Sequence, residues 1–383
     1  MLFRSKNPFP PIDHLHSANR NITPPGAFAN VGREGWELFL EDVGIGTTVL
    51  YTSAGLAFGK IVSRDWAIEL ARAYNNWLYD TYISGVKEAM DYNGSDKIYV
   101  EYRLDGTVTG RLSNAGYETD KHRMGISFHT LPRETKFNIR EYVVAPKGYK
   151  FITADMKSME LRVLAHLAKE KSMAKAFNDR IDLHTYSASM TFGKPMEKVT
   201  KEERQIAKEV SFLTVYGGTE KTLAMKRGIS FKKAKGIIDG WMATFPGVPR
   251  YMEHVQNFIT SNKYAYTIFG RRRNLPNAAS EAKYIRQEAF RQGLNFTVQS
   301  SASDTLVCCI LGLNQDLLKK KMGAKIIATV HDSIELIAPV NEVDETIALL
   351  YHHMTNYPYI KENFKFEFSV DRKSTRLNSS HRT

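Results

Sequence analysis

Cysteine is nearly absent from this sequence. The 383 residues include two cysteines, the adjacent Cys308 and Cys309, and neighbouring cysteines cannot easily form an ordinary disulfide with each other. We therefore expect buried, reduced thiols within the apolar run 306–313. Long apolar runs are lacking too: none approaches the ~18 residues of a transmembrane helix, and residues 1–13 lack the apolar core of a signal peptide. A cytoplasmic location is predicted.

Acidic residues are fewer than basic ones. Lys and Arg number 53 against 41 Asp and Glu, which gives a formal net charge of +12. A field of that sign attracts polyanions such as nucleic acid, although a merely basic soluble protein has the same balance. Hydrophobic residues make up 43% of the chain, which is enough for a large core, and the length predicts two or three subdomains.

Both ends of the chain lack clear elements. Residues 1–60 are rich in glycine and proline, match no phosphate-binding loop and are predicted to be irregular. A helical pattern then runs from 65 to 90. Residues 371–383 read as the translation of a common sequencing-library adapter, so we interpret them as an artefactual tail. The alternative is a disordered basic tail.

Strand-like segments flank a long helical region. Alternating patterns predict strands at 97–104, 150–154, 325–330 and 334–338, whereas helical patterns dominate 160–299, with turn signals at 193–195, 245–247 and 275–277. This order predicts an α+β fold in which a helical lobe is inserted between the halves of a mostly antiparallel sheet.

Two aspartates end predicted strands. Asp155 follows the strand 150–154, and Asp332 lies in a predicted tight turn after the strand 325–330. Taken singly, each is more often a turn or cap residue, but the shared sheet would bring two hard oxygen ligands together for Mg²⁺. Such a pair is typical of two-metal phosphoryl chemistry.

Four residues recur at intervals of four positions: Arg204, Lys208, Phe212 and Tyr216. Four residues turn an α-helix by about 400°, so all four lie on one side of one helix. Two cations followed by two aromatic rings suit a nucleoside triphosphate. A solvated basic face would explain the cations but not the aromatic residues in register. The pair Gly217-Gly218 is predicted to end the helix.

Longer motifs resemble DNA polymerases of family A. DMKSMELRVLAHLA from Asp155 is similar to that family's DYSQIELRxxAHL, RQIAKEVSFLTVYGG from Arg204 to its RxxxKxxxFxxxYG, and VHDS from Val330 to its VHDE. TGRLS, DLH, FPGV, FGRRR and RQGLNFTVQ also occur in family order. The resemblance covers residues 105–370.

The resemblance implies a right-hand polymerase fold, with an antiparallel palm sheet, inserted helical fingers and a helical thumb. It divides the chain into a partial thumb and entry to the palm (1–104), a first palm part (105–177), fingers (178–288) and a second palm part (289–370). The implied activity is template-directed addition of deoxynucleoside triphosphates to a primer 3′ hydroxyl, in replication or repair, with two magnesium ions held by Asp155 and Asp332.

Family roles carry over to matching positions. Arg204, Lys208 and His184 would bind the triphosphate, with Lys208 also protonating pyrophosphate. Tyr216 would stack at the templating position. Glu160 would exclude a ribose 2′ hydroxyl, and Phe212 would lie near the sugar 3′ carbon.

Five further residues would contact primer-template DNA. Arg291, Asn295 and Gln299 would follow the duplex from one helical face, given their four-residue spacing, and Arg111 would join them. His331 would lie by the primer terminus. A structural salt bridge is the alternative for Arg291.

Some positions depart from the family pattern. Met156, Lys157 and Ser158 replace Tyr, Ser and Gln, and Thr130 replaces Asn. Ser333 replaces the carboxylate after the second aspartate, so weakened metal binding is expected. The compact form with Ser333 suggests a bacteriophage source, which would place the enzyme in the host cytoplasm.

Two other classes of protein share parts of this pattern. A single-subunit RNA polymerase or reverse transcriptase has the same palm chemistry, but Glu160 and TGRLS argue against both. A truncated nucleic-acid-binding fragment without activity is the non-enzyme alternative. Membrane partners are not expected, and a processivity factor is left open.

Overall fold

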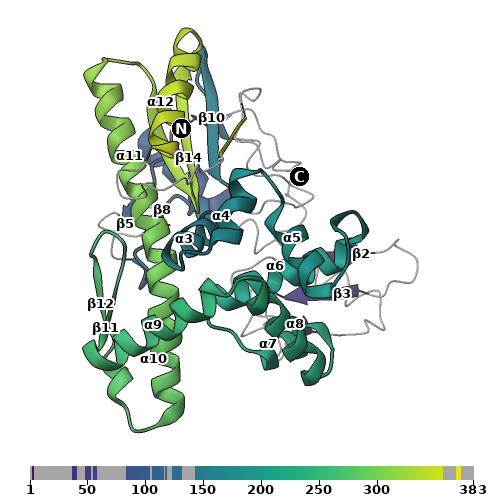
Figure 1. Cartoon of the computed structure of the whole chain (residues 1–383). Coiled ribbons are helices and arrows are strands. Elements are labelled where there is room, and N and C mark those ends of the chain that lie inside the picture. Colours follow the sequence, from purple (N-terminus) through teal and green to yellow (C-terminus); the bar gives the residue numbers. More distant parts are fainter. Residues whose placement is uncertain are drawn as a thin grey trace.

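The centre of the structure, a computed structural model, is a four-stranded antiparallel sheet with strand order β13-β14-β10-β15 (Figure 1). The strands are β10 (Tyr149–Met156), β13 (Lys325–Val330), β14 (Ser333–Pro339) and β15 (Phe368–Asp371). The sheet joins segments from both sides of the helical region, as predicted. The structure describes residues 2–3, 37–40, 48–52, 55–57, 83–103, 106–115, 117–118, 123–131, 143–356 and 368–371.

The strand register brings distant polar residues together. β10 and β14 pair so that Asp155 lies opposite Ser333 and Thr153 opposite Glu335. A two-residue loop, 331–332, joins β13 to β14, and His331 has a φ of 57° there, because two-residue hairpin loops need left-handed residues.

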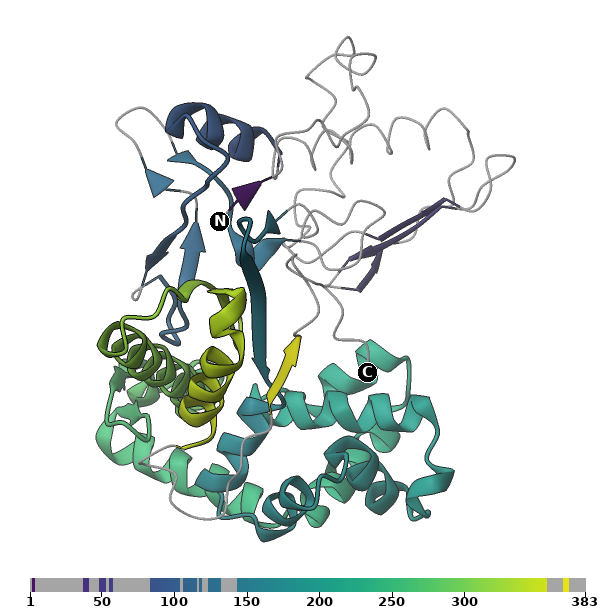
Figure 2. The ribbon, with the colours of Figure 1, turned by 90° about the horizontal axis from the view of Figure 1, so that it is seen from above.

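The two faces of the sheet contact different cores. Alternate residues of β10, Ile152, Ala154 and Met156, belong to the largest buried cluster, because successive side chains of a strand point to opposite faces. Phe151 and Ile337, on the other face, belong to a second cluster. Helices α11 (Ser301–Lys319) and α12 (Val343–Thr355) lie on one side of β10 (Figure 2).

Seven helices follow β10 and form most of the inserted region. They are α3 (Met159–Leu167), α4 (Lys171–Asn178), α5 (Leu183–Phe192), α6 (Lys201–Val215), α7 (Glu220–Arg227), α8 (Phe231–Thr244) and α9 (Gly247–Asn262). The predicted turns are confirmed: Gly193 caps α5 with a φ of 64°, Pro246 precedes α9, and a 3₁₀ turn, η5, spans Pro276–Ala279. Another 3₁₀ turn, η4, spans Met196–Lys198.

One long helical rod returns the chain to the sheet. It comprises α10 (Lys283–Asn295), the π-helical turn η6 (Phe296–Ser300) and α11 (Figure 1). Within the described residues this rod is the one helix long and apolar enough to cross a membrane, but 61% of its most apolar window is buried inside the protein, as in a core helix. The prediction of two buried thiols was half wrong: Cys309 is buried, whereas Cys308 is exposed.

The N-terminal region contains strands that the sequence did not predict. β2 (Glu37–Leu40), β3 (Thr48–Thr52) and β4 (Gly55–Ala57) form a three-stranded sheet, so the expectation of an irregular segment was wrong here. The β-branched and aromatic residues of ELFL and TVLYT favour strands, and the surrounding glycines and prolines hid them. Of the predicted helix 65–90, the structure describes the last part, within α2 (Gly85–Asn93).

Short elements complete the described chain. The predicted strand 97–104 is reduced to β5 (Glu101–Arg103), which pairs with β6 (Ser113–Ala115). The others are β1 (Leu2–Phe3), β7 (Tyr117–Glu118), β8 (Arg123–Met124), η2 (Phe128–Thr130), β9 (Val143–Val144), β11 (Tyr264–Tyr266), β12 (Arg272–Asn274) and η7 (Val340–Glu342). Of the adapter-like tail, Asp371 ends β15 opposite Thr153, and residues 372–383 lie outside the described chain.

Candidate active site

Two acidic residues lie at one end of the central sheet. Asp155 lies near the end of β10, and Asp332 lies in the neighbouring hairpin loop, where its carbonyl accepts a hydrogen bond of 3.2 Å from Met156 N. Both side chains are partly exposed. Their hard oxygen donors suit Mg²⁺. Among the residues that the structure describes, no group of three or more His, Cys, Asp or Glu is placed to hold a metal, so the acid pair is the donor set on which a metal site would rest.

Glu160 connects the acid pair to α6. It is buried on α3 and forms an ion pair with Arg111, whose Nη2 is also 3.7 Å from Asp332 Oδ1. Tyr216 donates a hydrogen bond of 3.2 Å to Glu160 Oε1. Burial, and then the Glu160 carboxylate, raise the pKa of Tyr216 to about 12, so its hydroxyl remains a neutral donor at pH 7.

The predicted triphosphate-binding residues gather along α6. The rings of Phe212 and Tyr216 stack with centroids 6.5 Å apart, and the His184 ring is 6.2 Å from Phe212. Burial, together with the charges of Arg204 and Lys208, lowers the pKa of His184 to about 4, although Asp182 opposes this shift. His184 is therefore neutral at pH 7, and its buried Nδ1 has no hydrogen-bond partner among the described residues.

Asp182 is a site residue that sequence reasoning missed, although its DLH segment was recognised. It caps α5 by accepting a bond from His184 N, and it pairs with Arg204 Nε at 2.5 Å. Burial raises the pKa of Asp182, but hydrogen bonds from Arg204 and Thr185 outweigh this effect and lower it. A triphosphate bound by Arg204 would have to compete with this carboxylate.

Local contacts fix the position of α6. Thr200 and Glu203 form a reciprocal capping box at its start, which satisfies two backbone donors. Buried Trp241 of α8 donates to Ser211 Oγ at 3.1 Å. The helix ends at Val215, one residue before Tyr216.

A glycine turn after α6 touches α10. Gly217 has a φ of 66°, and a Cβ atom there would lie 2.7 Å from Arg291 Cγ. Glycine is thus required for both the backbone conformation and the close approach. This contact links the predicted triphosphate helix to the predicted DNA-contacting helix.

The predicted DNA-contacting residues of the helical rod lie in two of its segments. Arg291 and Asn295 lie on α10, but Gln299 lies in the π-turn η6 and is buried. The shared DNA-facing surface of these three residues therefore stays a prediction, with Gln299 buried at its far end. Arg291 forms the ion pair considered as its alternative, with Glu288 at 2.6 Å, and Asn295 Oδ1 is buried without a hydrogen-bond partner among the described residues.

A histidine stack beside the acids was also missed. The rings of His331 and His129 stack with centroids 5.4 Å apart, and His129 Nε2 is 3.0 Å from Thr329 O. Tyr102 hydroxyl bonds both the N–H and the carbonyl of Thr329 at 2.8 Å. Burial lowers the pKa of His129, and Arg111 adds to this effect. These contacts join residues about 200 positions apart, so no local pattern signals them.

Arg271 of the FGRRR motif ties the TGRLS segment to α11. It pairs with Asp304 at 2.8 Å and donates to the carbonyl of Thr109 at 3.1 Å. Gly110 leaves room for this guanidinium, since a Cβ there would lie 2.3 Å from Arg271 Nη1. The FGRRR and TGRLS motifs are thus in direct contact next to Arg111.

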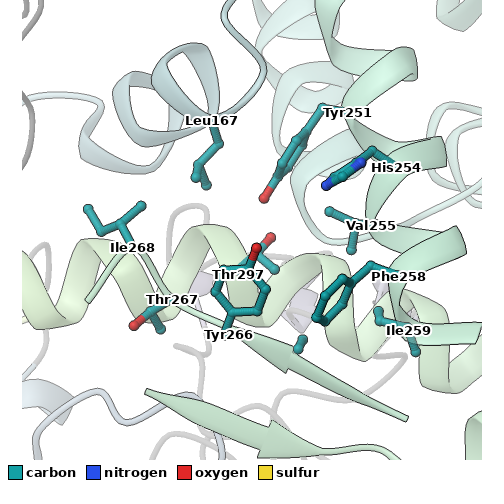
Figure 3. A pocket seen from close by; sticks show the side chains of 11 residues that line it. Leu167, Tyr251, His254, Val255, Phe258, Ile259, Tyr266, Thr267, Ile268 and Thr297 are labelled. Atoms are coloured by element: carbon teal, nitrogen blue, oxygen red, sulfur yellow. The ribbon is translucent and has the colours of Figure 1, made fainter. Parts of the chain in front are cut away.

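A separate pocket lies between α9, β11 and η6 (Figure 3). Its walls include the rings of Tyr251, Phe258 and Tyr266 and the side chain of Thr297. Phe258 and Tyr266 pack edge to face with centroids 5.1 Å apart, and burial raises the pKa of Tyr251. No residue of the acid cluster lines this pocket, so it belongs to the packing of the helical region.

Comparison with known proteins places these features in a family. A family model described as DNA polymerase family A matches residues 67–376. The chain belongs to DNA polymerase family A. The matched range extends into the adapter-like segment 371–383, so it includes Asp371, the last residue that the structure describes.

Curated relatives agree with this assignment. The family A chain is 33% identical to DNA polymerase I of Pseudomonas aeruginosa over 265 residues, which cover 69% of the chain and 28% of that relative. It is 31% identical to DNA polymerase I of Bacillus caldotenax over 292 residues, 76% of the chain and 32% of the relative. The chain thus spans a third or less of the length of these relatives.

A solved structure confirms the predicted fold. The POL domain of Pol1 from M. smegmatis, in complex with DNA primer-template and dNTP, superposes with a TM-score of 0.70 at 28% identity. The alignment covers 83% of the chain and 56% of that structure. The α+β right-hand polymerase fold expected from the motifs is therefore correct.

Proposed function

We propose that this chain is the polymerase part of a DNA-directed DNA polymerase, which extends a primer with deoxynucleoside triphosphates along a template. The observation that carries the proposal is the junction at Glu160. There Asp332, through Arg111, is connected to the aromatic end of α6, through Tyr216. The M. smegmatis relative, whose structure holds DNA primer-template and dNTP, supports the same ligands for this chain.

Asp155 and Asp332 would hold two Mg²⁺ ions, because paired carboxylates are the donors that this hard cation prefers. Bound there, the ions would activate the primer 3′ hydroxyl and stabilise the departing pyrophosphate. Arg111, 3.7 Å from Asp332, already supplies positive charge next to one of these carboxylates.

The α6 residues would bind the incoming nucleotide. Arg204 and Lys208 offer charge-assisted hydrogen bonds to phosphate oxygens, and Lys208 would give a proton to pyrophosphate. Neutral His184 can donate one hydrogen bond without adding charge. Phe212 and Tyr216 would face the sugar and the templating position, with Glu160 against the 2′ carbon of the sugar.

Arg111, Arg291, Asn295, Gln299 and His331 would contact the primer-template. Contacts to phosphates and the minor groove carry little sequence information, as a copying enzyme requires. The boundaries 1–104, 105–177, 178–288 and 289–370 are the corresponding thumb, palm, fingers and palm parts. A bacteriophage source and a cytoplasmic location belong to the same proposal.

Primer extension with the purified chain tests this function. Extension should require Mg²⁺ and all four deoxynucleotides, and Asp155→Asn or Asp332→Asn should abolish it while duplex binding persists, because binding rests on the cations. Asp239→Asn, an exposed acid paired with Lys235 on α8, is the control that should extend normally. If the unaltered chain binds DNA but does not extend the primer, the non-enzyme alternative is favoured. If it extends the primer with ribonucleotides alone, an RNA polymerase is favoured.

A further inference from the structure

A buried glutamate lies two residues beyond the position where the family motif has its acid. That position is occupied by Ser333, and Glu335 follows on the same face of β14, since side chains alternate along a strand. Glu335 is 2% exposed. Its cross-strand partner is Thr153, just as Ser333 is the partner of Asp155, so all four side chains lie on one face of the sheet.

Two hydroxyl groups bind the Glu335 carboxylate. Thr153 Oγ1 donates to Oε2 at 2.6 Å, and Ser333 Oγ lies 2.7 Å from Oε1 and 2.9 Å from Val330 O. A hydroxyl has one proton and two lone pairs, and a carboxylate attracts that proton more strongly than a carbonyl does. The Ser333 proton therefore points to Glu335, which leaves the lone pairs of Oγ for a donor on the Asp155 side.

Packing alone does not account for an acid at this position. The neighbouring residues on the same sheet face, Phe151 and Ile337, belong to an apolar cluster together with Val330. An apolar side chain at position 335 would join this cluster without the cost of burying a carboxylate. A buried acid with one oxygen bound to Ser333 therefore indicates a role at the neighbouring Asp155 site.

We propose that Ser333 and Glu335 together replace the carboxylate that the family motif has after the second aspartate. Glu335 is a positioning residue: it orients the Ser333 hydroxyl as an acceptor for a metal-bound water beside Asp155, and its charge adds to the negative potential there. This inference rests on the proposed function. It also reverses the expectation that Ser333 weakens metal binding.

Glu335→Gln is the first test, because an amide that donates to Ser333 occupies a lone pair of Oγ, turns the Ser333 proton to Val330 O and removes the carboxylate charge. The Mn²⁺ affinity of the DNA-free chain, measured by calorimetry, should fall about 10-fold, and the Mg²⁺ concentration for half-maximal extension should rise about 10-fold. The matched control is Glu170→Gln, another buried glutamate that accepts two hydrogen bonds, from Ser172 N and Gly247 N. The control should change the melting temperature but neither metal reading.

Moving the acid is the second test. Ser333→Glu alone should weaken Mn²⁺ binding, because two carboxylates would compete for one buried space, whereas Ser333→Glu combined with Glu335→Gln should recover most of it. Unchanged Mn²⁺ binding in Glu335→Gln, or a Ser333→Glu variant that binds more tightly by itself, would overturn the inference. Weaker Mn²⁺ binding in a chain that extends no primer would refute the proposed function but not this role.

Discussion

Glu160 accepts hydrogen bonds from residues on two sides of the site. Arg111 precedes the sheet in the sequence and Tyr216 follows α6, yet both donate a hydrogen bond to Glu160 Oε1. A buried carboxylate is stabilised when its oxygens are satisfied by such donors. Any change at this residue thus affects the positions of two other side chains as well as the proposed sugar site.

Glu160→Ala should raise ribonucleotide incorporation while the overall rate falls. The shorter side chain opens space for a 2′ hydroxyl, but it leaves Arg111 free to move further toward Asp332. Glu160→Gln, which keeps the volume, should retain sugar selection. Competition between matched ribo- and deoxynucleotides on one template measures this ratio, and an equal ratio in Glu160→Ala and the unaltered chain would place Glu160 away from the sugar.

His184 should make the chain less stable in acid. Its pKa falls from 6.5 to about 4 in the folded state, so the unfolded state binds the proton first, and stability is lost as the pH falls from 6.5 toward 4. His184→Gln should remove about 2 kcal/mol of the loss between pH 7 and pH 4.5. Urea unfolding at the two pH values tests this, with the change of the exposed His254 to Gln as the control. If the unaltered chain and both variants lose the same free energy of unfolding, His184 titrates normally.

At the scale of elements, local signals predicted α6 well and its surroundings poorly. The capping residue Thr200, the four-residue spacing and Gly217 fix the helix and its end from within one segment. The strands β2 to β4 were missed because glycines and prolines surround them, and the π-turn η6 was missed because it packs against the distant segments α3 and β11. The His129–His331 stack depends on such contacts too, so the site could be predicted from motifs only where its residues lie within them.

Gly217→Ala should disturb the junction between α6 and α10. A left-handed alanine costs about 1–2 kcal/mol, and here its Cβ would also meet Arg291. Gly228→Ala is a matched control, since Gly228 caps α7 with a φ of 61° and a Cβ there meets nothing within 4 Å in the described chain. Thermal unfolding and primer extension should show the larger loss for Gly217→Ala; equal losses would mean that the clash with Arg291 is relieved freely.

At the scale of the whole molecule, the order of strands and helices was enough to predict the architecture. Asp155 and Asp332 lie far apart in the sequence, but Asp155 lies near the end of β10 and Asp332 in the loop between β13 and β14 of the same sheet, so their proximity follows from topology. The ion-pair partners of the charged residues could not be predicted from the order of strands and helices. Arg291 was assigned to DNA by its match to the family motif, yet it pairs with Glu288 in the structure, and a measurement on the whole molecule can weigh these two roles.

The salt dependence of DNA binding provides that measurement. With a formal charge of +12, the chain should bind primer-template more weakly as salt rises, because each neutralised phosphate releases counterions. If Arg291 contacts a phosphate, Arg291→Ala should lower the slope of log affinity against log salt concentration by about 1. Lys320→Ala removes a cation from a comparable ion pair, with Glu345 at 2.9 Å, and should leave the slope unchanged. Because Arg291 must leave Glu288 to reach DNA, Glu288→Gln should tighten binding at low salt. Equal slopes for Arg291→Ala and Lys320→Ala would assign Arg291 to the helix surface, and its contact with Gly217 would then serve packing alone.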